Sequence, residues 1–258
     1  MKYVSSTADL DHVSLSLRNK NLAVIPYGHG YADAVLNRFL SSVSQWNTRR
    51  MLRKGFRVVV SEQIIEHPLV FRHLRPADRD ILDFGGAESL LALQLSALGY
   101  RVSVLDQRRY PFSHQNLSVF CGDLFDPALS LHKLFDVVVS ISTIEHLGLG
   151  RYGDMVVDSA DKRGVEVLWK LLKPHGRLFA TVPAGKPAVQ RGYRVYDEQR
   201  IREVFPHATA ISWFMKESRD ATWQQVKAGS IGELVYEEPH SQMPVQAVAC
   251  VVCDKAGD

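Results

Sequence analysis

The sequence lacks the features that mark secreted, membrane-spanning or disulfide-stabilised proteins. Only three cysteines occur among 258 residues, and no second Cys-x-x-Cys pair joins Cys250 and Cys253 to complete a zinc site. No apolar run is long enough to cross a membrane, and Met1 to Leu10 contain no apolar core like that of a signal peptide. We therefore expect a reduced, cytoplasmic protein with no metal site and no membrane partner.

A strong charge of either sign is also missing. Lys and Arg number 31 and Asp and Glu 28, which gives a net charge of +3 and does not by itself indicate a nucleic-acid partner. One basic cluster occurs, and a solvated helix face accounts for it more simply than an RNA-binding surface. The cluster consists of Arg49, Arg50, Arg53, Lys54 and Arg57.

The chain changes character near residue 75. Residues 1–75 are mixed in pattern, with one expected helix from about Tyr31 to Leu52, and we expect a helical cap or extension there. Residues 76–258 alternate short apolar runs with helical stretches, which is typical of a parallel sheet with crossover helices. The expected strands are Asp80–Phe84, Arg101–Leu105, Leu117–Cys121, Phe135–Ser140 and Arg177–Val182, with helices over Glu88–Leu98 and Ala160–Leu172.

The end of the chain follows a different pattern. Two apolar runs, Ala208–Lys216 and Val245–Cys253, succeed one another with no strong helix between them. Successive strands without a crossover helix indicate an antiparallel pair. Cys250 and Cys253 are three apart in the second run, so they point to opposite faces of the sheet and are expected to be core residues. The sequence thus predicts a Rossmann-like α/β fold whose mostly parallel sheet ends in a C-terminal antiparallel strand pair.

A glycine pair follows the first expected strand, at the position where ligands bind in such folds. Gly85 and Gly86 allow a sharp turn and a close approach of backbone to a ligand, and a helix is expected to begin at once. Asp106 closes the next strand about 20 residues later, the spacing at which an acidic residue holds ribose hydroxyls. The full G-x-G-x-x-G is absent, and Asp83 in the approach to the turn would repel a pyrophosphate and attract a cation. A tight turn without a ligand is the alternative.

Acidic and basic side chains follow two more of the expected strands. Asp123 comes after the third strand, where its carboxylate could accept a hydrogen bond from an adenine amino group, although aspartate after glycine is common in plain turns. Glu145 and His146 come after the fourth strand. Histidine titrates near neutrality and can act as a general base, with Glu145 orienting it or binding a cofactor. Alternatively, the pair only starts a helix and braces the pocket.

Four segments taken together resemble the class I S-adenosylmethionine-dependent methyltransferase family. They occur in that family's order and spacing, over about residues 67–197, and read ILDFGGAESLLALQLSALGYRVSVLD, VFCGDLFD, FDVVVSISTIEHLGLGRYGD and LLKPHGRLFATVPAG. The resemblance implies S-adenosylmethionine as the cofactor. One departure matters: the family's first motif usually has a small residue between its glycines, whereas here the glycines are adjacent.

The resemblance also implies a role for individual residues. Asp83, Gly85 and Gly86 would line the methionine part of the cofactor, with the backbone of Ser140 beside them. Asp106 would hold the ribose hydroxyls. The residues bordering adenine would be Asp123 and Leu124.

Two loops at the same edge of the sheet, residues 148–154 and 185–197, offer groups for a methyl acceptor, although ordinary surface loops look alike. The candidates are Arg151, Tyr152, Arg191, Tyr193, Arg194 and Tyr196. The fourth strand is not followed by Asn/Asp-Pro-Pro-aromatic, and no Pro-Cys dipeptide occurs, which counts against two kinds of nucleobase methylation. We expect O-methylation of a small molecule, such as a sugar, a glycan precursor or a secondary metabolite. The alternatives are an RNA methyltransferase and a catalytically inactive, cofactor-binding partner subunit.

Overall fold

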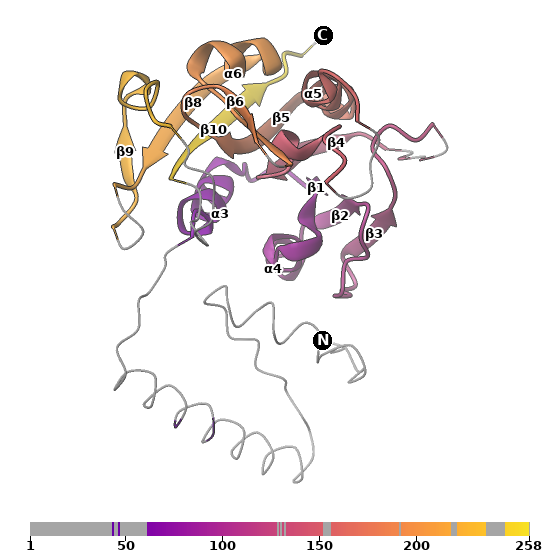
Figure 1. Cartoon of the computed structure of the whole chain (residues 1–258). Coiled ribbons are helices and arrows are strands. Elements are labelled where there is room, and N and C mark those ends of the chain that lie inside the picture. The colour runs from indigo at the N-terminus through magenta and orange to yellow at the C-terminus, as the bar shows by residue number, and fades with distance from the viewer. Residues whose placement is uncertain are drawn as a thin grey trace. The chain divides into compact units, whose positions relative to one another are not determined.

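A mixed sheet of eight strands forms the centre of the protein in the computed structural model (Figure 1). The structure describes residues 61–127, 129, 131, 133–151, 156–190, 192–217, 221–235 and 246–257, with Val43 and Trp46. The strand order is β3-β2-β1-β4-β5-β10-β8-β9. The strands are β1 Asp80–Phe84, β2 Arg101–Asp106, β3 Leu117–Cys121, β4 Phe135–Ile141, β5 Leu172–Pro183, β8 Ala208–Met215, β9 Gln224–Val226 and β10 Ala247–Asp254.

The directions of the strands confirm the predicted fold. Strands β3, β2, β1, β4 and β5 pair in parallel, whereas β10 is antiparallel to both of its neighbours, β5 and β8. A last strand inserted against the direction of both its neighbours separates this arrangement from an all-parallel dinucleotide-binding sheet. The parallel pairing also brings the carboxyl ends of β1, β2, β4 and β5 to one edge, where ligands of open α/β sheets bind.

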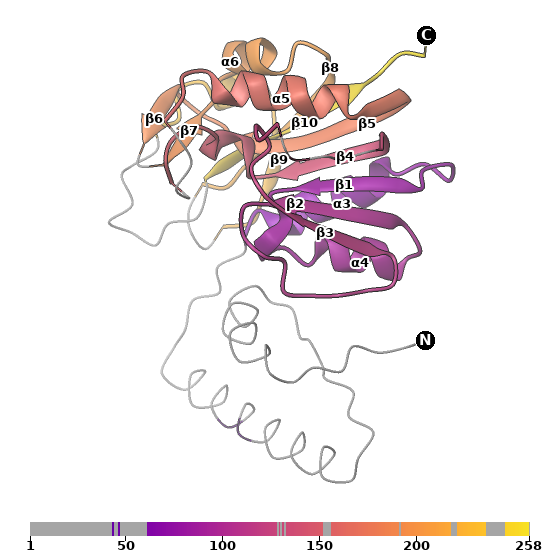
Figure 2. The same cartoon turned by 90° about the vertical axis from the view of Figure 1, so that its right-hand side faces the viewer.

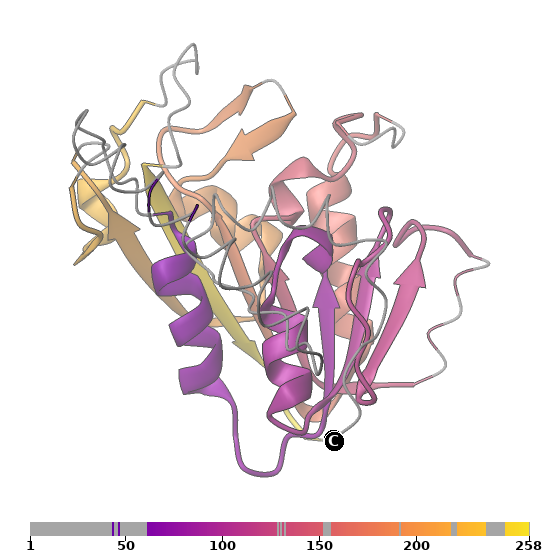
Figure 3. The same ribbon diagram turned by 90° about the horizontal axis from the view of Figure 1, so that it is seen from below.

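Helices cover both faces of the sheet, as Figure 2 and Figure 3 show. Helices α3 Gln63–His73 and α4 Leu91–Ala97 lie on one face, and α5 Ala160–Lys170 and α6 Glu198–Val204 on the other. Successive side chains of a strand point to opposite faces of the sheet, so alternate strand residues belong to two separate hydrophobic cores, one under α3 and α4 and one under α5 and α6. Cys250 belongs to the core under α3 and α4, and Cys253 to the core under α5 and α6. Their placement on opposite faces is therefore confirmed.

Several boundaries differ from the prediction. The chain does not enter a helix directly after the glycines: a 3-10 turn, η1 Gly86–Glu88, precedes α4, because Ser89 is extended and its hydroxyl accepts from the N–H of Leu91 at 3.0 Å. The loop expected after β5 contains a hairpin, β6 Ala188–Gln190 and β7 Tyr193–Val195. Strands of three residues are too short to show a period of two in the sequence.

The predicted N-terminal extension, residues 1–75, is described only in part. Helix α3, which lies within the predicted extension, belongs to the compact unit that contains the sheet, and its Val70 is a buried core residue. The helix expected over Tyr31–Leu52 lies outside the described residues except for Val43 and Trp46, which are helical. Within the described part of the chain, none of the helices has both the length and the apolar character that a membrane span requires.

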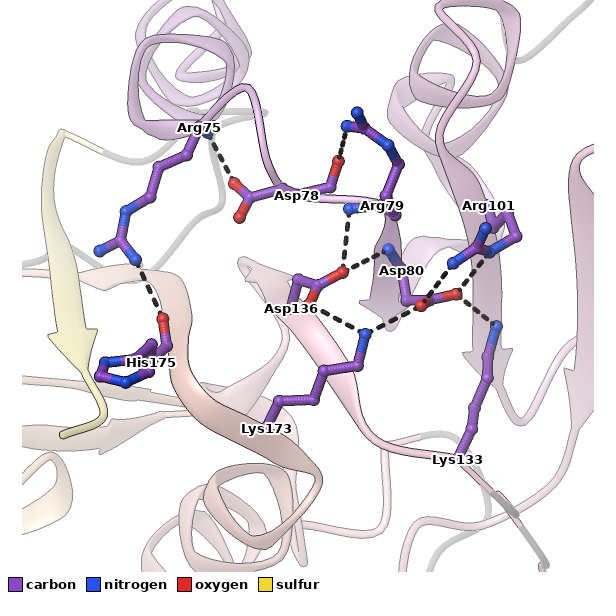
Figure 4. Close-up of polar contacts among 9 residues, drawn as sticks. All are labelled: Arg75, Asp78, Arg79, Asp80, Arg101, Lys133, Asp136, Lys173 and His175. Atoms are coloured by element: carbon purple, nitrogen blue, oxygen red, sulfur yellow. Dashed lines mark hydrogen bonds and ion pairs between the residues drawn. The ribbon is translucent and has the colours of Figure 1, made fainter. Parts of the chain in front are cut away.

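A network of charged residues fixes the amino ends of the parallel strands (Figure 4). The Asp136 carboxylate on β4 accepts from the backbone N–H of Asp80 at 2.8 Å and of Arg79 at 2.9 Å. Lys173 donates to both Asp136 and Asp80 at 2.9 Å, and Arg101 donates to Asp80 through two nitrogens at 2.8 Å. The hydrogen bonds from Arg101 hold the pKa of Asp80 well below its usual value, although burial opposes the shift. The network ties β1, β2, β4 and β5 together at the edge opposite the candidate site.

Removing the Asp136 carboxylate should destabilise the protein. In Asp136→Ala the buried N–H of Asp80 loses its acceptor, and we expect the free energy of unfolding to fall by about 1–3 kcal/mol. Urea denaturation with an unchanged m-value measures the loss. Glu198→Ala is the matched control, because its partner Arg202 has a side chain that is 61% exposed and such pairs contribute about 0–1 kcal/mol. Equal losses in the two variants would contradict the role of the network.

Candidate functional site

The turn after β1 is shaped by two side chains that occupy the space beside its glycines. Gly85 has a φ of 79°, and a side chain there would meet Thr143, which follows β4. A side chain at Gly86 would meet the carboxylate of Asp83. Both glycines are therefore required, and the adjacent pair sets a turn that places Asp83 and Thr143 against the same short stretch of backbone.

Asp83 is buried with an unsatisfied oxygen. The residue is 1% exposed, and among the described residues its Oδ2 has no hydrogen-bond partner. Burial, helped by the charge of Asp106, raises the pKa of Asp83 to about 7. A buried acceptor of this kind is stabilised by a ligand that brings a hydrogen-bond donor or a positive charge.

Asp106 lies at the end of β2, as predicted, and holds the glycine turn in place. Its Oδ2 accepts from the N–H of Ala87 at 3.0 Å, and its Oδ1 from the N–H of Arg108 at 2.8 Å. The Arg108 guanidinium turns back over the carboxylate, at 3.1 and 3.3 Å from its two oxygens, and pairs with Glu88 at 2.5 Å. For ribose hydroxyls to reach Asp106, Arg108 must release these contacts, and its side chain is 37% exposed and so able to turn outward.

The residues expected to border adenine and methionine lie on neighbouring strand ends. Asp123 accepts from the N–H of Phe125 at 2.9 Å and from the side chain of Gln107 at 3.4 Å. Leu124 is buried in the core under α5 and α6. Ser140 is fully buried near the end of β4, and its hydroxyl has no partner within the described chain. Their roles toward a cofactor remain predictions.

Helix α3 contributes a residue that the sequence did not reveal. Glu66 is fully buried, and its Oε1 accepts from Thr181 on β5 at 2.7 Å and from Ser142 after β4 at 3.1 Å. Its Oε2 has no partner among the residues described. Burial, followed by the charge of Glu62, raises the pKa of Glu66 to about 8. A single glutamate in a helical stretch is usually exposed, and only the packing of α3 on the sheet shows otherwise.

Glu145 and His146 lie in a 3-10 turn, η2 Ile144–His146, directly after β4. Glu145 is 2% exposed, and burial followed by the charge of Glu66 raises its pKa well above the usual value. The Nδ1 of His146 lies 2.5 Å from the carbonyl oxygen of Gly192. Because a carbonyl only accepts, Nδ1 donates, and Nε2 is the basic nitrogen of the neutral ring. This Nε2 lies 3.8 Å from Oε1 of Glu145.

Two of the residues expected to contact an acceptor make contacts within the protein that brace the loop. Arg194 donates to the carbonyl of Leu147 at 2.6 Å and lies 3.8 Å from Asp161 of α5. Tyr196 is fully buried, with its hydroxyl 3.3 Å from Asp161. The two residues are two apart in an extended segment, so they share the face that packs on α5 and η2. Whether either residue also contacts an acceptor stays a prediction.

The remaining loop candidates differ in position. The side chain of Arg151 lies against Gly192, so the loops 148–154 and 185–197 meet beside His146. Tyr193 donates from its hydroxyl to Gln190 on the same hairpin. Tyr152 and Arg191 lie outside the described residues. No group of three or more His, Cys, Asp or Glu side chains that could hold a metal ion occurs among the residues that are described.

Comparisons with known proteins agree with the fold. Residues 104–233 match the family described as "Caenorhabditis protein of unknown function, DUF268", and no curated protein matches the chain. The structure is similar to the 1,6-didemethyltoxoflavin-N1-methyltransferase of Burkholderia thailandensis, with 16% identity, coverage of 91% of this chain and 93% of that one, and a TM-score of 0.51. It is also similar to the [4+2]-cyclase SpnF, with 12% identity, coverage of 77% and 84%, and a TM-score of 0.52. The chain therefore has the Rossmann-like fold of class I methyltransferases.

The buried carboxylates predict an unusual pH dependence of stability. Glu66 and Asp83 have pKa values of about 8 and about 7 in the folded protein, against 4.5 and 3.8 as ordinary values. At pH values between the ordinary and the folded pKa of each group, the folded state binds more protons than the unfolded state. The contribution of these two carboxyl groups to the free energy of unfolding therefore decreases as pH rises from about 5 to 8. In Glu66→Gln the decrease should be smaller, and at pH 8 the variant should be at least as stable as the parent. Urea unfolding of the ligand-free protein at pH 5.5, 6.5, 7.5 and 8.5 tests this, and an unchanged slope in the variant would contradict it.

Proposed function

The chain belongs to the DUF268 family, and we propose that it is a methyltransferase that uses S-adenosylmethionine to methylate a hydroxyl group of a small molecule. The observation that carries this proposal is the unsatisfied, buried carboxylate of Asp83 beside the glycine turn. A dinucleotide would bring the negative charge of its pyrophosphate to this carboxylate, whereas S-adenosylmethionine brings positive charge. The solved structure of the Burkholderia thailandensis methyltransferase holds S-adenosylhomocysteine in the same fold.

The residues at the carboxyl edge fit this cofactor from one end to the other. Asp83 and the glycine turn would hold its methionine part, with the backbone of Ser140 beside them. Asp106 would hold the ribose hydroxyls once Arg108 has turned away. The side chains that would border the adenine are Asp123 and Leu124. When bound, the cofactor supplies a methyl group on a positively charged sulfur, ready for displacement by an acceptor atom in line with that bond.

The protein's own contribution to the reaction is to orient the acceptor and to take its proton. We assign the proton to Nε2 of His146, because the Gly192 carbonyl fixes the tautomer in which this nitrogen is basic. Glu145, 3.8 Å away, would stabilise the ring once it is protonated. Arg194 and Tyr196 hold the loop that carries Gly192, through Leu147 and Asp161 respectively. They therefore act by positioning the base.

The fold alone does not decide the reaction. SpnF is described as a cyclase, so a protein with a similar fold performs different chemistry, and the activity must be argued from the site. The basic cluster Arg49–Arg57, on which an RNA substrate would depend, lies outside the described residues. A catalytically inactive partner subunit would bind cofactor without turning over any acceptor.

Replacement of Asp106 tests the cofactor. Asp106→Ala should weaken binding of S-adenosylhomocysteine by about 10- to 150-fold, since each charged hydrogen bond contributes about 1.5–3 kcal/mol. Arg108→Ala should not weaken it, because the Arg108 guanidinium competes with the ribose for Asp106. Isothermal titration calorimetry measures both affinities. Unchanged affinity in a folded Asp106→Ala protein would remove Asp106 from the ribose site.

Replacement of His146 tests the base. His146→Ala should lower the methylation rate by about 100- to 10,000-fold and leave cofactor affinity nearly unchanged, because the imidazole acts on the acceptor's proton. Single-turnover rates with a methylated product detected by mass spectrometry provide the measurement. If His146 only braces the pocket, cofactor affinity and Tm will instead fall together, and a parental rate would exclude it as the base.

A further inference from the structure

Two glutamates from distant parts of the chain are buried together at the carboxyl edge of the sheet. Glu66 comes from α3 and Glu145 from η2 after β4, and they are 0% and 2% exposed. Ser142, three residues before Glu145, bonds to Glu66 at 3.1 Å. Ser142 and Glu145 lie on the same short segment after β4, and burial, together with the charge of Glu66, raises the pKa of Glu145, so the two carboxylates belong to one buried region.

Each of these carboxylates has one oxygen with a polar side chain nearby and one buried oxygen without a donor. Oε1 of Glu66 accepts from Ser142 and Thr181, and Oε1 of Glu145 faces Nε2 of His146. The Oε2 atoms of both residues are buried and have no hydrogen-bond partner in the described part of the chain. Two such buried carboxylates are destabilising in their charged form unless a ligand supplies donors to both, and burial therefore favours their protonated form in the free protein.

Three kinds of cationic group could satisfy the two Oε2 atoms: a metal ion, a guanidinium and a primary ammonium. A metal site needs more ligands, and the described residues contain no group of three or more metal-binding side chains. A guanidinium pairs best with both oxygens of one carboxylate, but Glu66 and Glu145 each offer only one. A primary ammonium has three separate donors and a full positive charge, so it can bond to one oxygen of each glutamate at once.

We propose that Glu66 and Glu145 bind a primary ammonium group of the methyl acceptor, which is therefore an amino alcohol. This inference rests on the proposed function, and it adds the substrate class. Glu145 would contact the ammonium through Oε2 and the base His146 through Oε1, so the hydroxyl to be methylated lies only a few bonds from the amine. A neutral sugar or alcohol would leave both oxygens unsatisfied and would bind less tightly. The raised pKa values of both glutamates show that the charged carboxylates lack stabilising partners in the free protein, and a bound cation would supply one.

The cofactor also carries a primary ammonium group, and this group is the other candidate partner for the two glutamates. Asp83 supplies a separate buried carboxylate with an unsatisfied oxygen, beside the glycine turn after β1. We therefore assign the cofactor's positive charge to Asp83 and the acceptor's ammonium to the two glutamates. The experiment is designed to separate the two sources.

The test uses simple cations and the full-length protein. Methylammonium and ethanolamine, each titrated against tetramethylammonium at equal ionic strength, should raise Tm by about 3–6 °C at ten times their Kd. Tetramethylammonium should not, because it has the charge but no N–H donors. Each titration is run without cofactor and again with saturating S-adenosylhomocysteine, and protection should persist in both.

Two variants identify the residues responsible. Glu66→Gln keeps an acceptor for Ser142 and Thr181 but removes the charge, and Glu145→Gln does the same in η2, so either variant suffices if the other fails to fold. Both should lose the protection by primary ammonium and keep the parental affinity for S-adenosylhomocysteine. Glu198→Gln removes an exposed charge on α6 and should behave like the parent.

Three results would overturn the inference. Equal protection by tetramethylammonium would mean that no N–H donor is recognised, and protection that survives in both glutamine variants would place the site elsewhere. Protection that disappears in saturating S-adenosylhomocysteine, together with weaker cofactor binding by Glu66→Gln, would assign the glutamates to the cofactor's own ammonium. A failure of S-adenosylhomocysteine to bind would instead overturn the proposed function, and the titrations without cofactor would still decide whether the ammonium site exists.

Discussion

Three carboxylates, those of Asp83, Glu66 and Glu145, are buried at one edge of the sheet, and each has an oxygen that no donor among the described residues satisfies. Transfer of such groups from water costs several kcal/mol, so the surrounding structure must hold them there. The parallel arrangement of β1, β4 and β5 does so, because it directs three strand ends to the same place, and α3 closes the cluster from one face of the sheet. The glycine turn closes on Asp83, and Glu145 lies within η2.

Acidic residues at the amino and carboxyl edges of the sheet have pKa values shifted in opposite directions. At the amino edge, Asp80 and Asp136 are paired with Arg101 and Lys173, and their pKa values fall. At the carboxyl edge, Glu66 and Asp83 lack such partners, and their pKa values rise. Paired charges contribute to stability, whereas unpaired buried charges reduce it, and carboxylates with perturbed pKa values of this kind cluster at functional sites.

Arg108 covers the carboxylate that the proposed ribose site requires. Its guanidinium provides donors for Asp106 and reaches Glu88 across the glycine turn. The guanidinium thereby adds charged donors to a carboxylate that also accepts from the backbone N–H groups of Ala87 and Arg108. A ribose bound at Asp106 would replace the charged donors of Arg108 with neutral hydroxyls. The loss of the Arg108–Asp106 contacts would therefore reduce the net binding free energy of the cofactor.

Much of the fold could be predicted because it depends on local pattern. The apolar runs at Asp80–Phe84 and Arg101–Asp106, and the antiparallel end at Ala247–Asp254, follow from strand length and from the absence of a crossover helix. The positions of Asp83, Asp106, Glu145 and His146 at strand ends followed in the same way, because the carboxyl ends of parallel strands meet at one edge.

What the sequence could not determine depends on contacts between distant segments. Glu66 is more than 70 residues from Ser142 and over 100 from Thr181, and nothing in its helix indicates that it is buried beneath strand ends. The inward orientation of Arg194 and Tyr196 depends on Asp161 of α5, a partner that no local spacing reveals. The sequence by itself determined the order of the elements and the edge at which polar residues gather, since these depend on periodicity and strand direction. Only the tertiary structure decided which of those residues are buried with an unsatisfied oxygen and which are held by partners within the protein, because that depends on how α3, α5 and the β6–β7 hairpin pack around the edge.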